Sequence, residues 1–501
     1  MPHSITRVSA RQWFLLVAIL AYALLFQGAR AIYSPDEGRY TDVALGMLDD
    51  GDWLRPMLHP EFEHWTKPPL TYWAIATSIA IFGQNEFAAR LPNALAFAGT
   101  IFLLLRLGRR VTPVQPWRPA LVYATFLFPF AASNIVTTDT LLTLFETMQL
   151  VGFADLWWST TPKEKRRAIW LLWFGAGLAF VTKGPPGLLL LAGCLAFAVI
   201  DAGWRGIARV LRWDGLLIFL VVGCGWYLVA ILREPGVLRY FLVEEVVNRI
   251  ASNKMHRNGA WYDGFRIYLP VLLLGTLPWL PLAIVRMWRT HRPLRAYWTS
   301  SLWTRWLLCC IGLPLLVFML SRSRLPLYIL PLFVPIACLV ALRLGRLNME
   351  KGWRSATVWS WCVLLVCARG AAALLHPHDD DKRLSEALSR ALPQVPAEIA
   401  FVETAPRYGM RFYLGSTIER LTLPGRRILP ASEGLAEEMN EDEGCRVLMV
   451  DAANLAATLE SLDALKIPYR RARDVEGYAL LVNITPLCKS YAALTGADDR
   501  L

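Results

Sequence analysis

The chain has 501 residues, of which 55% are apolar, 21 are Trp and only 18% are charged, and its mean hydropathy is +0.37. Soluble globular proteins carry about 25% charged residues, so the composition excludes an ordinary soluble domain and predicts a polytopic membrane protein. The net charge of +12 does not indicate nucleic-acid binding, because Lys and Arg lie in short loops between apolar runs, where the positive-inside rule places them.

The apolar residues form about eleven runs, each close to the ~20 residues that cross a bilayer. The first run is too long for the apolar core of a signal peptide and no clean cleavage site follows it, so we interpret it as a retained span. The runs are 12–29, 92–107, 119–131, 139–158, 167–181, 186–201, 214–232, 267–286, 303–320, 326–343 and 355–373.

The apolar stretch from Lys67 to Gly83 is interpreted as a helix lying along the membrane interface. If this stretch is not counted as a membrane span, every basic loop lies on the same side of the membrane as the N-terminus. If it is counted as a span, the later basic loops move to the opposite side. Its Tyr72 and Trp73 suit the headgroup zone. The outer side then receives the loop 30–91, the turns "SNIVTTDT", "VTKGPPG" and "SRSRLP", the loop 233–266 and the tail from about 375.

The tail alternates strand-like and helical segments, which indicates a small α/β domain. The strand-like segments are "EIAFVET", "CRVLMVDA" and "YALLVNI", and the helical ones are "DKRLSEALSRAL", "EGLAEEM" and "AATLESLDAL". Cys445 and Cys488 lie in this tail; an oxidising compartment would allow them to pair, and the sequence leaves paired and free cysteines equally open. We therefore predict a transmembrane domain at 1–374, with juxtamembrane helices in loop 30–91, and a periplasmic α/β domain at 375–501.

The stretch "YSPDEGRYTDVALGMLDDGDWLRP" follows the first apolar run. Ser34 and Glu37 fit a capping box with Pro35 at the first helical position, and an apolar stripe then allows the helix to lie on the membrane surface. Capping leaves Arg39 unexplained, because a cation in the first turn opposes the helix dipole. A structural and a functional role for Asp36 both remain open on these residues alone.

Other charged residues lie at the same outer boundary, and each alone fits a capping or snorkelling role. They are Lys67, Asp139, Lys183, Glu244, Glu245, Arg249, His256, Arg322 and Arg324. A charge at this depth is costly unless it is paired or functional. Together these residues predict a water-filled cavity in which carboxylates serve one substrate and Lys and Arg bind the phosphate of a lipid.

Eight motifs, in order through about residues 20–340, resemble the bacterial C-type glycosyltransferases. They are "YSPDEGRYTDVALGML", "GDWLRP", "HWTKPPLTYW", "NEFAARLPNALA", "TDTLL", "VTKGPPG", "YLPVLLLGTLPWLP" and "SRLPLYILP". The chain is most similar to the aminoarabinose (lipid A) transferases and to the wider protein-mannosyltransferase-like set. The motifs are specific for this superfamily and say little about the sugar.

The resemblance implies an all-α membrane domain of about 11–13 spans with the C-type glycosyltransferase fold, followed by the small outer α/β domain. It implies an inverting transfer of a sugar from undecaprenyl phosphate, whose sugar-linked form is the co-substrate. The acceptor would be a glycolipid such as lipid A, another glycan or a protein. The enzyme would be a monomer in the inner membrane, with its active site facing the periplasm. By resemblance the catalytic residues are Asp36, Glu37 and Asp139. Those that bind the donor phosphate and lipid are Arg39, Tyr40, Lys67, Lys183, Arg249, Arg324 and Tyr328.

The chain departs from the aminoarabinose transferases at their metal site. There a Glu precedes the Lys of the "KP" motif and joins a His of a later loop, whereas this chain has Thr66 and "VEEVVNR" at these places. His64 with Glu244 or Glu245 would make a thin ligand set, so the pattern does not favour a divalent metal or aminoarabinose itself. The rival function is a transporter or flippase of a lipid-linked sugar. It is less well supported, because transporters show repeats and polar residues at mid-membrane.

Overall fold

The computed structural model describes residues 10–58, 63–241, 258–289, 301–344, 352–375, 377–426, 432–439 and 446–483. The chain divides into two compact units, which are described separately. The helical unit comprises residues 1–27, 65–78 and 87–372, and the sheet unit comprises residues 28–64, 79–86 and 373–501. The sheet unit thus includes residues 30–64 and 79–86 of the first outer loop as well as the tail. The periplasmic position predicted for residues 375–501 stays a prediction.

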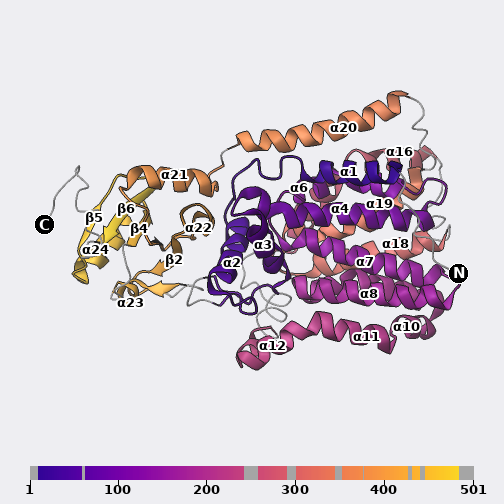
Figure 1. The fold of residues 1–501 in the computed structure, drawn as a ribbon, viewed down its shortest axis with the longest axis horizontal. Helices are drawn as coiled ribbons and strands as arrows, with labels where there is room; N and C mark the ends of the chain where they lie inside the picture. Colours follow the sequence, from indigo (N-terminus) through magenta and orange to yellow (C-terminus); the bar gives the residue numbers. More distant parts are fainter. Residues whose placement is uncertain are drawn as a thin grey trace. The chain divides into compact units, whose positions relative to one another are not determined.

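The helical unit is built almost entirely of helices, several of which are labelled in Figure 1. They are α1 (Ala10–Leu24), α4 (Glu86–Val111), α5 (Arg118–Ala124), α6 (Leu127–Ala132), α7 (Thr138–Trp158), α8 (Pro162–Lys183), η1 (Pro185–Leu188), α9 (Leu189–Ala202), α10 (Trp204–Val210), α11 (Trp213–Phe219), η2 (Leu220–Cys224), α12 (Gly225–Arg233), α13 (Val237–Arg239), α15 (Asp263–Gly275), α16 (Trp279–Arg289), α18 (Leu302–Leu320), η4 (Pro326–Leu332), α19 (Phe333–Leu344), α20 (Gly352–Ala371) and η5 (Ala372–Leu374). Helix α3 (Leu70–Phe82) is shared between the two units.

Among the described residues, six helical segments are long and apolar enough to cross a membrane, or seven if the pair α15 and α16, bent by 88°, is one span. The many-helix membrane fold predicted from the apolar runs is therefore confirmed. Helices α7 and α8 have 21 and 22 residues, which is also span length. Helix α3 has only 13 residues, too few to cross a bilayer. Its position along the interface stays a prediction.

Helices α7 and α8 form a tightly packed antiparallel hairpin, visible side by side in Figure 1. Glycines make the close approach possible. A Cβ atom at Gly152 of α7 would lie 2.6 Å from the backbone nitrogen of Leu172, and one at Gly175 of α8 would lie 2.8 Å from the Met148 side chain. Any larger residue would push the helices apart. This hairpin fixes the position of the residues at its two ends.

The sheet unit contains a six-stranded sheet in the order β3-β2-β1-β4-β6-β5. The pairs β3–β2, β2–β1 and β1–β4 are parallel. The pairs β4–β6 and β6–β5 are antiparallel. The elements are α2 (Asp36–Asp50), α21 (Asp381–Ala391), β1 (Glu398–Val402), α22 (Gly409–Leu414), β2 (Thr417–Thr422), β3 (Glu433–Gly434), α23 (Leu435–Glu438), β4 (Arg446–Asp451), α24 (Leu455–Ala464), β5 (Tyr469–Arg471) and β6 (Tyr478–Asn483).

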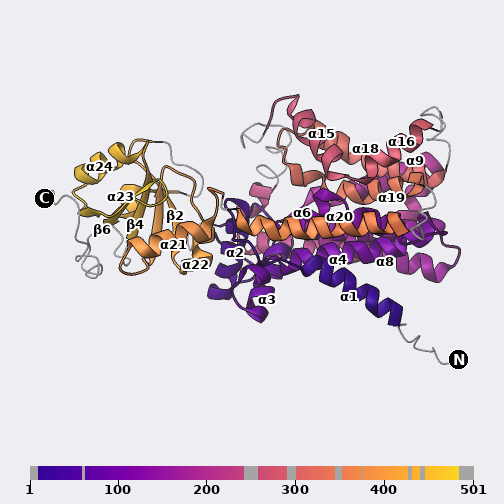
Figure 2. The same cartoon turned by 90° about the horizontal axis from the view of Figure 1, so that it is seen from above.

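Apolar side chains fill both faces of this sheet. Along β1, Ile399 and Phe401 pack with Leu388 of α21, whereas Ala400 and Val402 pack with Leu462 of α24. Alternate strand residues point to opposite faces, so the two helices cover opposite sides, as Figure 2 shows. The small α/β domain predicted from the tail is confirmed.

Three glutamates are buried together at one end of the sheet. Glu398, Glu419 and Glu438 have carboxylate oxygens within 4.8 Å of one another, and Arg446 forms ion pairs with Glu398 and Glu438. Burial raises the pKa of Glu398 to about 8 and that of Glu419 to about 7, because one guanidinium does not offset three carboxylates. The folded unit therefore holds protons that an unfolded chain releases near pH 4.5.

Because the folded-state pKa values are raised, the free energy of unfolding of the sheet unit falls as pH rises from about 5 to about 8, by up to ~1.4 kcal/mol per pH unit for each proton. We expect Glu419→Gln to remove part of this loss. Hydrogen exchange of the β1 and β2 amides is measured in the full-length variant and in wild type, and comparing the two at the same pH cancels the intrinsic exchange rates. The protection factor of Glu419→Gln divided by that of wild type should rise from pH 5.5 to pH 8.0. Exposed Glu460 of α24 provides the control Glu460→Gln, and a pH-independent ratio for Glu419→Gln would contradict the prediction.

Candidate active site

One end of the α7–α8 hairpin carries a buried ion pair. Asp139 lies in the first turn of α7 and Lys183 in the last turn of α8, and their side chains are 7% and 6% exposed. The Lys183 ammonium also lies 4.4 Å from the centre of the Tyr328 ring, a cation–π distance. Three residues that the motifs predicted to share a site are therefore together in the structure.

Arg324, in the turn between α18 and η4, belongs to the same cluster. Its Nη1 donates to the carbonyls of Asn258 and Ala260 at 2.9 and 2.7 Å, and its Nη2 donates to Met319 at 2.9 Å. Tyr268 of α15 interacts electrostatically with Arg324, Tyr328 and Asp139. Backbone carbonyls thus hold the guanidinium within electrostatic reach of Tyr268, with its charge unneutralised by these partners.

Several buried polar atoms around this cluster have no hydrogen-bond partner among the described residues. They are the Tyr268 hydroxyl, the hydroxyls of Thr137 and Thr138 beside Asp139, the Ser323 hydroxyl and the Arg324 Nε. Buried polar groups are nearly always hydrogen-bonded, to protein, ligand or ordered water. Such a concentration of hydroxyl and guanidinium donors beside a lysine suits an oxyanion.

Two buried polar residues that the sequence reasoning missed support the Lys183 turn from α7. The Glu146 carboxylate accepts the Leu190 amide at 3.3 Å, and Gln149 Nε2 donates to the Gly187 carbonyl at 2.8 Å. They follow Asp139 by seven and ten residues, so all three share one face of α7. That spacing of polar residues within an apolar helix was the available signal, as was the polar Tyr268 in α15.

The other end of the hairpin carries the basic loops. Arg106 and Arg110 at the end of α4 each lie 2.5 Å from the Asp155 carboxylate near the end of α7. Helix α8 begins at Pro162, among exposed basic residues, and ends at Lys183. At 1.5 Å per residue it extends roughly 33 Å, the thickness of a hydrocarbon core. The Asp139–Lys183 pair and the basic loops are therefore a membrane thickness apart.

In the sheet unit, α2 carries the Asp-Glu motif. Asp36 forms an ion pair with Arg39, and the two side chains are 43% and 25% exposed. Tyr40 is buried. The predicted capping box is wrong: α2 begins one residue later than expected, and the Ser34 hydroxyl donates to the Asp381 carboxylate at 2.7 Å. The apolar stripe is also buried within the protein, partly because Gly38 lets α2 approach the backbone of Gly409 in α22.

Glu37 differs sharply from its neighbour Asp36. Its carboxylate is 3% exposed, receives hydrogen bonds of 2.6 and 2.8 Å from the Arg30 guanidinium and a third of 3.1 Å from the Tyr33 amide. A carboxylate enclosed in this way is poorly placed to meet a substrate. The geometry favours a structural role for Glu37 over the catalytic one that the resemblance implies.

We therefore expect Glu37→Gln to lower the thermal stability of the purified chain while leaving kcat per folded molecule within about threefold. Breaking a buried pair leaves the Arg30 charge uncompensated, which costs about 3–5 kcal/mol. Differential scanning fluorimetry and kcat normalised to folded protein measure the two effects. A large loss of kcat in protein of normal stability would restore the catalytic role.

The remaining predicted residues are only partly described. Lys67 donates from its Nζ to the Thr66 carbonyl at 2.8 Å. Arg249, Glu244, Glu245, His256, Cys445 and Cys488 lie outside the described residues. Among those described, the metal-type group is the Glu398, Glu419 and Glu438 cluster, where the Arg446 guanidinium already provides the cation.

The chain is similar to known proteins of one kind. The family model described as dolichyl-phosphate-mannose-protein mannosyltransferase matches residues 66–227. The undecaprenyl phosphate-alpha-4-amino-4-deoxy-L-arabinose arabinosyl transferase of Shewanella sediminis is 34% identical over 334 residues, 65% of this chain and 58% of the relative. Transferase 2 of Pseudomonas fluorescens (strain Pf0-1) is 31% identical over 353 residues, 67% of this chain and 60% of the relative. The matches thus span about three fifths of the length of these relatives.

A solved structure covers the whole fold. The crystal structure of ArnT from Cupriavidus metallidurans bound to undecaprenyl phosphate superposes with a TM-score of 0.76 at 18% identity, over 98% of this chain and 100% of that one. Its apo state gives a TM-score of 0.74. The C-type fold expected from the motifs is therefore confirmed. The chain is therefore similar to the aminoarabinose transferases and, over residues 66–227, to the protein-mannosyltransferase family model, as the motifs predicted.

Proposed function

We propose that the chain transfers a sugar from a polyprenyl phosphate, such as undecaprenyl phosphate, to an acceptor at the outer face of the inner membrane. The observation that carries this proposal is the buried cluster of Asp139, Lys183, Arg324 and Tyr328, whose neighbouring hydroxyls have no partner among the described residues. The named relatives use undecaprenyl-phosphate-linked sugars, which agrees with an anion site at the end of a membrane hairpin.

In the proposed reaction, the acceptor oxygen attacks the sugar C1 while the bond from C1 to the donor phosphate oxygen breaks. The electron pair leaves with the polyprenyl phosphate, and the configuration at C1 inverts. Lys183 and Arg324 stabilise the negative charge that develops on the phosphate, with help from Lys67, Arg39 and Arg249. Asp139 holds the Lys183 ammonium in place.

Asp36 is the proposed acid at the reacting carbon. When the acceptor is a hydroxyl, the Asp36 carboxylate takes its proton as a general base. When the acceptor is a phosphate of lipid A, no proton moves and Asp36 orients the acceptor or stabilises positive charge at C1. Its exposed carboxylate suits either role better than the enclosed Glu37 does.

A transporter or flippase of the same lipid-linked sugar is the competing function, and micelles separate the two because they have no opposite sides. Purified chain in detergent is mixed with a synthetic aminoarabinosyl or hexosyl polyprenyl phosphate and lipid A, and products are measured by mass spectrometry. We expect free polyprenyl phosphate and glycosylated acceptor in equal amounts. If the donor stays intact with each sugar tested, although the protein still binds that donor, the result would support the transporter.

A further inference from the structure

The start of helix α2, which carries the proposed acid Asp36, is hydrogen-bonded to the start of helix α21. The Ser34 amide donates to the Asp379 carbonyl at 3.0 Å. The Asp381 amide donates to the Ile32 carbonyl at 3.2 Å. The Ser34 hydroxyl donates to the Asp381 carboxylate at 2.7 Å, and this side-chain bond joins residues 347 positions apart in the chain. Two distant segments therefore meet at the helix end that presents Asp36.

The Asp381 carboxylate is enclosed where α2, α21 and α22 begin. Its side chain is 0% exposed, and its Oδ1 accepts a hydrogen bond of 2.6 Å from Arg407 Nε. Two glycines make room for its other oxygen. A Cβ atom at Gly409 would lie 2.0 Å from Asp381 Oδ2, and one at Gly38 would lie 3.1 Å from the same atom. A side chain at either position would push aside the carboxylate or the backbone beside it.

Arg407 neutralises this buried carboxylate, and the protein satisfies the Arg407 guanidinium in turn. Its Nη1 donates to the His378 carbonyl at 2.9 Å, and its side chain also forms a hydrogen bond with that of Tyr478 on β6. Compared with apolar residues, such a buried pair adds little net stability, because both charges lose their hydration. It does fix geometry: with Arg407 on Oδ1, the Asp381 Oδ2 atom is left to the Ser34 hydroxyl.

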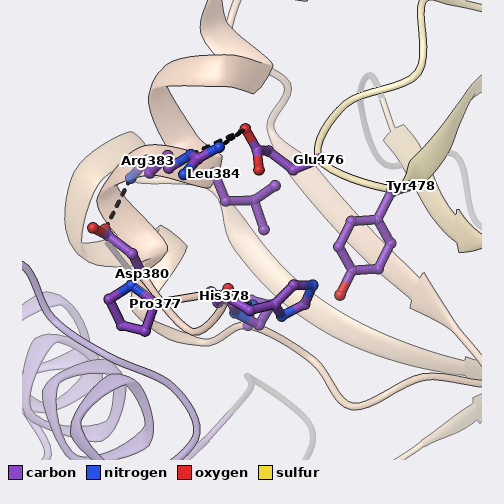
Figure 3. A pocket seen from close by; sticks show the side chains of 8 residues that line it. Pro377, His378, Asp380, Arg383, Leu384, Glu476 and Tyr478 are labelled. Carbon is purple, nitrogen blue, oxygen red and sulfur yellow. Dashed lines mark hydrogen bonds and ion pairs between the residues drawn. The ribbon is translucent and has the colours of Figure 1, made fainter. Parts of the chain in front are cut away.

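Helix α21 is itself firmly held, so it provides a fixed support for α2. Asp380 caps the helix, because its carboxylate accepts the Arg383 amide at 3.0 Å. The Arg383 guanidinium pairs with Glu476 at 3.0 Å, and Figure 3 shows both interactions. Leu388 of α21 is buried against the sheet. A hydrogen bond from Ser34 to this helix therefore ties the start of α2 to the body of the sheet unit.

Two other contacts of α2 have different effects. The pair of Glu37 with Arg30 joins residues seven positions apart within one segment of the chain, so it moves with the helix. Arg411 of α22 pairs with Asp42 at 3.3 Å, in the middle of α2. Helix α2 should therefore stay folded and attached when the Ser34 side-chain bond is lost, and its first turn should be the part that shifts.

We propose that Asp381 is a positioning residue for sugar transfer, which acts through Ser34 to hold the first turn of α2 where Asp36 meets the reacting carbon. The inference rests on the proposed function, because it takes Asp36 as the acid at that carbon. Asp381 itself does not touch the substrate. A displacement of about 1 Å can cost a reaction about 10²-fold in rate. Loss of this tie therefore lowers kcat and leaves donor binding at Lys183 and Arg324 intact.

The test compares two substitutions of equal size at Ser34, because Thr keeps the hydroxyl and Val replaces it with a methyl group. The full-length chain is assayed with a polyprenyl-phosphate sugar and lipid A. Ser34→Thr should keep kcat within about threefold of wild type. Ser34→Val should lower kcat at least about tenfold, as the loss of one hydrogen bond to a charged group implies. Donor affinity should stay within about twofold in both variants.

A double-mutant cycle attributes the loss to this pair of residues. Asp381→Asn and the double variant Ser34→Val with Asp381→Asn should have the same kcat within about threefold, because the tie is already lost in each single variant. Leu462→Ala is the control for lost stability, since Leu462 of α24 is buried on the face of the sheet opposite α21. It should lower Tm and leave kcat per folded molecule unchanged.

Equal kcat for Ser34→Thr and Ser34→Val would overturn the proposal. Additive losses in the double variant, or a loss in Ser34→Val that comes entirely from weaker donor binding, would also overturn it. Failure of the proposed function looks different, because wild type itself would then transfer no sugar. Hydrogen exchange of the first-turn amides of α2 would still report on the tie: it should be faster in Ser34→Val than in Ser34→Thr, and equal exchange would refute the tie as well.

Discussion

Replacing Asp36 by Asn is expected to reduce kcat for sugar transfer by about 10²–10⁴-fold, the range for loss of a general base. The free energy of unfolding should change by less than ~0.5 kcal/mol, because the Asp36 carboxylate is 43% exposed. Donor affinity should stay within about twofold of the wild-type value. Initial rates and native mass spectrometry of bound polyprenyl phosphate measure the two quantities on the same preparation.

Asp49 provides the matched control for this variant. It lies on the same helix α2, is 65% exposed, and is paired with Arg411 as Asp36 is paired with Arg39. Asp49→Asn should leave kcat unchanged. If Asp36→Asn keeps more than about a third of the wild-type rate, Asp36 is not the acid at the reaction centre and the base role fails.

Replacing Lys183 by Met is expected to have two separable effects. The buried Asp139 charge loses its partner, which should lower the free energy of unfolding by about 3–5 kcal/mol. The donor phosphate loses a cation, which should weaken polyprenyl phosphate binding at least thirtyfold, about 2 kcal/mol. Thermal unfolding and equilibrium binding in nanodiscs measure them.

The double variant Asp139→Asn with Lys183→Met separates the two roles. It removes both charges, so most of the stability should return while phosphate binding remains weak. Lys163→Met, at the exposed start of the same helix α8, is the control and should change neither quantity. Restored binding in the double variant would mean that the pair only holds the hairpin together and that the phosphate lies elsewhere.

The sequence predicted the positions of Asp139 and Lys183 well, because each lies where an apolar run begins or ends. The resemblance implied that Lys183 and Tyr328 share a site, but their contact depends on packing between α8 and η4, which apolar patterning alone leaves undetermined. Glu146, Gln149 and Tyr268 were missed for a related reason. Single polar residues within an apolar run hardly change its hydropathy, although their spacing on one helix face was visible.

The sheet unit shows a similar division. Strands β1, β4 and β6 were predicted because they are continuous apolar runs, buried on both faces. Strand β2, "TIERLT", was not, because its Glu419 and Arg420 resemble a solvent-exposed segment, whereas Glu419 is buried against Glu398 and Glu438. The packing of α2 on α22 joins residues about 370 positions apart along the chain, and local patterns do not report such contacts.

The side of the membrane at which Lys183 and Arg324 lie is tested most directly by two single cysteines, introduced in a background without native cysteines. Arg322→Cys lies exposed beside Arg324, and Lys165→Cys lies exposed among the basic residues at the other end of α8. An impermeant maleimide added to intact cells should label position 322 and leave position 165 unlabelled until the membrane is opened. Labelling of position 165 from outside would place the phosphate site in the cytoplasm and contradict transfer at the outer face.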